Sequence, residues 1–200
     1  GGAAFSHTTI DSKGHEEDWK FEPECKMGDT EIIDLDVVTG IDNENVFGGE
    51  GAFRLKNIHL QGEYMMAMMK REKDLKDASF NGGYVSLSWV LTGESKPYLM
   101  EEGEFGKIIP KSNKLGAWEL AARYSYIDMT DEDAYQNESA FAAGTPGIFG
   151  GKAANIAFGL NWYPNPSVRF MMNYIMVVNS DTADGTGNLL GNDDFSILAA

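Results

Sequence analysis

Cysteine, basic residues and long apolar runs are all scarce in this chain of 200 residues. Cys25 is the single cysteine, so no intrachain disulfide can form and the disulfide-stabilised class is excluded. The longest apolar stretch, about residues 64–69, is far shorter than the ~18–20 residues that a membrane-spanning helix needs. The 16 basic and 31 acidic residues give a net charge of −15, which argues against nucleic acid as a partner.

Several functional motifs are also missing. Residues 1–5 lack the charged and apolar regions of a signal peptide. The sequence has no Cys/His spacing typical of a zinc site, and no nucleophile is paired with a base. We therefore expect no catalytic residue, no bound metal, no cofactor and no enzymatic activity.

The sequence does contain apolar residues at every second position, which is typical of strands with two different faces. The clearest example is the stretch 155–162. Its apolar face consists of Ile156, Phe158, Leu160 and Trp162. Residues 168–177 repeat the pattern after the stretch 163–167, which holds two prolines and an asparagine and predicts a tight turn. Residues 151–178 are therefore expected to form a hairpin of two long strands.

Similar alternation predicts about ten strands in total. The clearer ones cover residues 46–55, 58–69, 84–91 and 117–127, and the weaker ones cover residues 3–10, 18–24, 32–39 and 193–200. The best helix candidate, residues 64–78, does not keep its apolar residues on one helical stripe.

The connections favour a membrane barrel. Residues 55–57 and 163–167 are short turns, whereas the longer polar loops cover residues 11–17, 71–79, 129–150 and 179–192. Strands of about ten residues match the ~9–11 that cross a bilayer at a tilt. Short turns on one side and long loops on the other are typical of an outer-membrane barrel. The alternative is a soluble antiparallel sandwich or barrel, which also alternates.

Four stretches of the sequence carry a more specific signal. They are GAWELAARYSYID at 116–128, GLNWYPNPSVRFMMNY at 159–174, LQGEY at 60–64, and LTGE followed by PY within 91–98. In order and spacing these stretches resemble the C-terminal half of the phosphate-selective porin O and P family.

The resemblance implies an all-β fold, an antiparallel transmembrane β-barrel in the outer membrane of a Gram-negative bacterium. Family members are trimeric 16-stranded porins, so residues 1–200 would be the C-terminal portion of a single barrel domain, with about ten strands. The N-terminal strands and the signal peptide would then be absent from this sequence. The implied function is passive diffusion of small anions such as phosphate or polyphosphate, with lipid and lipopolysaccharide around a homotrimer.

Function in a porin depends on the charges that face the lumen. Strand parity places five basic or titratable side chains inside: Lys20, Arg54, His59, Arg123 and Arg169. It also places six acidic residues there: Glu22, Asp34, Asp36, Glu50, Glu63 and Glu119. Counting the Lys and Arg residues alone, the predicted lumen charge is 4 − 6 = −2. Arg123 and Arg169 are the best candidates for anion contact, or they pair across strands with Glu119 or Glu63.

Residues 93–115 form an unusually long connection on the short-turn side, and long loops in compact domains are usually functional. If this segment folds into the lumen, Lys107, Lys111 and Lys114 would constrict the pore. Otherwise the segment is a solvated periplasmic turn. A second functional hypothesis is a soluble all-β binding module or hydrolase with an acidic cleft.

Overall fold

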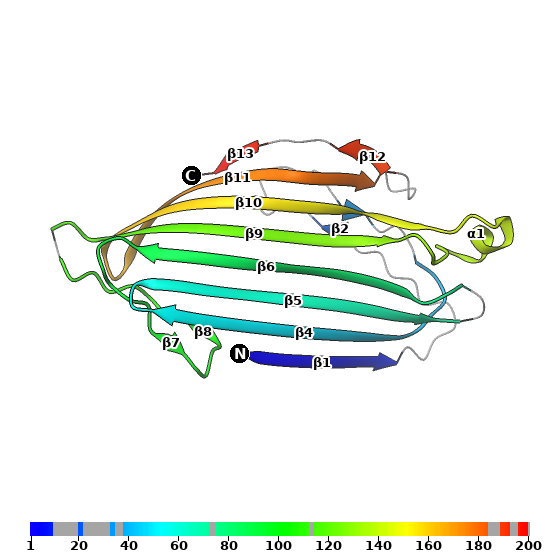
Figure 1. Cartoon of the computed structure of the whole chain (residues 1–200), viewed down its shortest axis with the longest axis horizontal. Coiled ribbons are helices and arrows are strands. Elements are labelled where there is room, and N and C mark those ends of the chain that lie inside the picture. Colours follow the sequence, from blue (N-terminus) through cyan, green and yellow to red (C-terminus); the bar gives the residue numbers. More distant parts are fainter. Residues whose placement is uncertain are drawn as a thin grey trace.

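The computed structural model describes residues 1–9, 20–21, 33–34, 38–72, 75–112, 114–183, 189–192 and 196–199. Its main element is one antiparallel sheet with the order β1-β4-β5-β6-β9-β10-β11-β12, in which β13 also pairs with β11 (Figure 1). The strands are β1 (Gly2–Thr9), β4 (Ile41–Leu55), β5 (Ile58–Arg71), β6 (Ala78–Val90), β9 (Ala117–Asp131), β10 (Ile148–Asn165), β11 (Val168–Ala183), β12 (Leu189–Asn192) and β13 (Ser196–Ala199).

The alternating stretches form the strands that the sequence predicts. The hairpin within 151–178 is confirmed, because β10 and β11 pair from Lys152↔Asp181 to Asn165↔Val168. The strands β4, β5, β6, β9, β10 and β11 are 13–18 residues long, which exceeds the length needed to cross a bilayer. The strand β11 extends into the predicted loop 179–192, and β12 pairs with its far end.

The weaker predictions for residues 18–24 and 32–39 as barrel strands are wrong for the residues described. β2 (Lys20–Phe21) and β3 (Ile33–Asp34) pair with each other in a separate two-stranded sheet, and β3 lies against β10 and β11. β1 pairs directly with β4, which leaves no room in the sheet for a strand between them. The other residues of the two predicted strands, apart from Val38 and Thr39, lie outside the described part of the structure.

The apolar face of the sheet is exposed, and residues 93–115 lie against part of the polar face. The apolar face is uncovered, and large side chains such as Phe53, Phe158 and Phe170 are 61%, 51% and 58% exposed. At the short-turn end of this face the rings of Trp118, Trp162 and Phe170 stack, with centroid separations of 5.7 and 5.4 Å. A soluble sheet would cover its apolar face and expose its polar face, so this arrangement disfavours the soluble alternative.

Buried apolar clusters lie near the two ends of the strands. The larger cluster gathers near the long loops and includes Val38, Ile41, Met69, Phe80 and Ile148. The smaller cluster, at the short-turn end, consists of Val90, Ile108 and Ala117. These clusters fix the loops to the sheet ends and leave the middle of the polar face free for polar side chains.

One buried cation organises the long-loop end. The Arg71 side chain is 7% exposed and donates hydrogen bonds to the backbone carbonyls of Thr39, Leu75, Tyr135 and Gln136. These carbonyls belong to the three connections that precede β4, β6 and β10. A single guanidinium therefore ties three loops together.

The connection before β10 also contains α1 (Glu138–Ala143). Asn137 caps its start and Gly144, in the left-handed conformation, ends it. Among the described residues, no helix is long and apolar enough to cross a bilayer.

Candidate functional site

The polar face is occupied at its short-turn end by residues 93–115, which we call the inner segment. It contains the small hairpin of β7 (Tyr98–Leu99) and β8 (Glu104–Phe105). The Lys96 amide donates to His59 Nε2 at 3.0 Å, and Arg54 Nη1 donates to the Lys96 carbonyl at 3.1 Å. Because His59 and Arg54 lie on the polar faces of β5 and β4, these contacts place the inner segment against the polar face.

His59 is buried beneath this contact, with 2% of its surface exposed. Its Nδ1 lies 3.4 Å from Ser88 Oγ, and its ring packs edge-on against Phe105 with the centroids 5.1 Å apart. Since Nε2 accepts a hydrogen bond from an amide, the proton of the neutral ring lies on Nδ1. His59 therefore positions the inner segment.

A second contact joins the inner segment to β9 and β10. Glu119 is 1% exposed and forms a salt bridge with Lys96 Nζ, which also donates to Ser88 Oγ at 3.3 Å. Its other oxygen accepts from the Tyr163 hydroxyl at 2.7 Å and from Asn161 Nδ2 at 3.2 Å. A buried carboxylate requires such compensation because its desolvation is costly.

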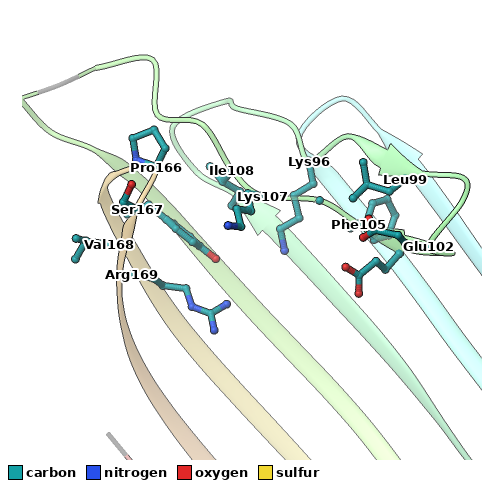
Figure 2. Close-up of a pocket in the computed structure, with 13 residues that line it drawn as sticks. Lys96, Leu99, Glu102, Phe105, Lys107, Ile108, Pro166, Ser167, Val168 and Arg169 are labelled. Carbon is teal, nitrogen blue, oxygen red and sulfur yellow. The ribbon is translucent and has the colours of Figure 1, made fainter.

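Next to this network is a cavity of about 790 Å³ between the inner segment and the β10–β11 turn (Figure 2). Three cationic side chains, those of Lys96, Lys107 and Arg169, point toward the same space in Figure 2. Glu102 and Glu104 also line the cavity. The cavity therefore combines three basic with two acidic groups, whereas strand parity predicts an excess of acidic groups for the part of the lumen that this chain lines.

Glu94, which is 3% exposed, joins the two ends of the inner segment. Its carboxylate accepts hydrogen bonds from the Lys111 amide at 3.0 Å and from the Thr92 hydroxyl, while Lys111 Nζ donates to the Gly93 carbonyl at 2.8 Å. Burial alone would raise the pKa of Glu94, but the hydrogen bonds from Lys111 and Thr92 outweigh it and hold the pKa below its ordinary value.

Replacing Glu94 with glutamine is expected to lower the free energy of unfolding at neutral pH by roughly 1–2 kcal/mol, because hydrogen bonds to a charged acceptor are lost. A depressed pKa stabilises the folded state above the ordinary pKa, and this contribution disappears as the pH falls through the folded-state pKa. Urea unfolding of both proteins in detergent, from neutral pH down to pH ~3, should show the difference shrinking with acid. An equal difference at every pH would contradict this role.

Three other residues predicted for the site do not line the cavity: Arg123, Lys111 and Lys114. The Arg123 guanidinium carbon lies 4.1 Å from the centre of the Tyr84 ring. Lys111 is engaged with the base of the inner segment, and the exposed Lys114 donates its backbone N–H to Ser112 Oγ at 3.3 Å. Lys20 lies in β2, and its side chain falls outside the described part of the structure.

Lys96 and Tyr163 are the site residues that sequence reasoning did not identify. Lys96 is separated from Glu119 by 23 positions, and only the fold of the inner segment brings them together. The sequence predicts a turn that begins at Tyr163, but this residue belongs to β10 and its hydroxyl donates to Glu119. Among the described residues, no group of three or more His, Cys, Asp or Glu side chains could hold a metal ion.

An antiparallel sheet of long strands with an uncovered apolar face, and with a connecting segment and a partly basic cavity on its polar face, is the architecture of a transmembrane β-barrel protein. The sheet itself is open, with β1 at one edge and β12 and β13 at the other among the described strands. The family model described as "Phosphate-selective porin O and P" matches residues 7–200, and the chain belongs to this family.

Two relatives illustrate the relationship. Porin O of Pseudomonas aeruginosa is 29% identical over 147 residues, which cover 73% of this chain and 32% of that protein. An uncharacterised protein of Caulobacter vibrioides is 31% identical over 100 residues, 48% of this chain and 17% of that protein. The matched part of the chain thus spans about a third of the length of Porin O.

Proposed function

We propose that the chain forms part of an outer-membrane porin of a Gram-negative bacterium, through which small anions such as phosphate and polyphosphate diffuse passively. The observation that carries the proposal is the cavity on the polar face, into which Lys107 and Arg169 project. Basic side chains along a water-filled path lower the barrier for anions. Membership of the phosphate-selective porin O and P family supports the same conclusion.

The proposal assigns roles to the other parts of the structure. Lipid and lipopolysaccharide would contact the uncovered apolar face, since that face exposes rings that water does not favour. An open sheet edge is not tolerated in lipid, so we propose that the edges pair with further strands of a larger single-domain barrel, within a homotrimer. Arg54 and Arg123 would extend the basic path along β4 and β9, with Lys111 and Lys114 at the base of the inner segment.

The selectivity test uses the full-length protein in planar bilayers under a salt gradient. Replacing both Lys107 and Arg169 with methionine is expected to lower the anion-to-cation permeability ratio about fivefold, because each charge near the path contributes on the order of 0.5–1 kcal/mol. The matched control is Lys76→Met, which removes an exposed lysine from the β5–β6 connection, at the opposite end of the strands. A wild-type reversal potential that favours cations would contradict the anion proposal.

A simpler measurement separates the porin from the soluble binding module or hydrolase. A barrel that depends on detergent and migrates differently on SDS gels before and after heating would support the porin. A monodisperse protein in buffer without detergent would refute it.

A further inference from the structure

Three side-chain donors surround the Glu119 carboxylate. An ammonium from Lys96, a phenol from Tyr163 and a carboxamide from Asn161 converge on its two oxygens. Charge-assisted hydrogen bonds from such donors are also how a protein would bind phosphate. The difference is that here the anion is a side chain of β9 and is always present.

Lys96 both contacts this carboxylate and lines the cavity. Its side chain is 19% exposed, and it lines the cavity with Lys107 and Arg169. Lys107 and Arg169 are both exposed, and within the described part of the chain neither forms a salt bridge with a carboxylate. The three cations therefore differ, because the charge of Lys96 alone is balanced by a buried carboxylate.

We propose that Glu119 is a specificity-determining residue: it acts as an internal counter-anion that withholds Lys96 from passing anions and so limits phosphate binding in the cavity. This inference rests on the proposed porin function. Lys107 and Arg169 are then the cations that meet the solute, and Lys96 anchors the inner segment. Removing the charge of Glu119 makes Lys96 available to an oxyanion in the cavity.

The test measures how inorganic phosphate blocks the chloride current of the full-length protein in planar bilayers. Glu119→Gln is expected to lower the half-blocking phosphate concentration about tenfold, the gain of one charge-assisted hydrogen bond. The matched control is Glu102→Gln, which removes one negative charge from the same cavity without touching the Lys96 contact. It should shift the half-blocking concentration less than about threefold, through the general field alone.

A second variant keeps the inference testable even if Glu119→Gln fails to fold. The double variant Lys96→Gln with Glu119→Gln replaces the ion pair by two neutral amides of similar size. Its half-blocking phosphate concentration should be higher than that of Glu119→Gln, because the tighter block of the single variant requires the charge of Lys96. Heat-modifiable migration on SDS gels confirms that each variant is folded.

The outcomes separate this inference from the proposed function. If the wild type conducts anions but Glu119→Gln behaves like Glu102→Gln, the role of Glu119 is refuted and the porin stands. If phosphate blocks the double variant as tightly as Glu119→Gln, the gain does not come from Lys96 and the inference is also refuted. A wild type that prefers cations and is insensitive to phosphate would overturn the proposed function and this inference together.

Discussion

Replacing Arg71 with alanine is expected to lower the free energy of unfolding by about 3–5 kcal/mol. The guanidinium is 7% exposed and donates to the carbonyls of Thr39, Leu75, Tyr135 and Gln136. Hydrogen bonds from a charged donor contribute ~1.5–3 kcal/mol each, and carbonyls left unpaired in a buried site add their own desolvation cost. Urea unfolding in detergent micelles, followed by tryptophan emission, measures the loss.

Lysine at the same position is the matched control. It keeps the charge but lacks the planar fork of five donors, so Arg71→Lys should recover only part of the lost stability. Limited proteolysis of the alanine variant should cut the connections before β4, β6 and β10 sooner than in the wild type. Unchanged stability in Arg71→Ala would show that these loops are held by the apolar cluster around Val38 and Phe80 alone.

Replacing Gly116 with alanine is expected to lower the free energy of unfolding by about 2–5 kcal/mol. Gly116 has φ +65°, in the region that favours glycine, and an added Cβ would lie 2.3 Å from the Tyr163 carbonyl oxygen and 2.8 Å from Pro164 Cα. The left-handed conformation costs an alanine ~1–2 kcal/mol, and overpacking against backbone atoms that cannot rotate away adds ~1–3 kcal/mol. Because Gly116 joins the inner segment to β9, the variant should also displace the lysines that line the cavity.

Gly103 supplies the control for this prediction. It has nearly the same φ, +68°, but an added Cβ would have nothing within 4 Å. Gly103→Ala should therefore cost only the conformational ~1–2 kcal/mol. Equal destabilisation of the two variants, in urea unfolding or in the temperature of the heat-induced gel shift, would show that the contact with Tyr163 and Pro164 is unimportant.

The strands could be predicted from the sequence because their signal is local. In β10 the alternation of Phe158, Leu160 and Trp162 reflects one face in lipid and one face in water, and each strand carries this pattern on its own. The short alternation around Phe21 is too weak to distinguish a strand of the barrel from a piece of a connection. The fold class, the hairpin and the side on which the long loops lie follow from such local signals.

The contacts that build the site could not be predicted in this way. Lys96 meets Glu119 only because the inner segment turns back onto the polar face, and strand parity says nothing about a connecting segment. The sequence predicts that Arg71 begins a loop, whereas it is the last residue of β5, and its partners are backbone carbonyls that any residue type would supply. Parity did place Glu119, Arg54 and His59 on the polar face, but it could not show which of them would be covered.

The aromatic stack on the apolar face gives the protein a built-in optical probe. Of the four tryptophans, Trp89, Trp118 and Trp162 lie at the short-turn ends of their strands, with Trp118 and Trp162 stacked. Indole rings prefer the depth of the lipid headgroups, and their emission depends on the polarity around them. The ultraviolet fluorescence of the protein therefore reports mainly on one rim of the barrel, the same rim that carries the inner segment.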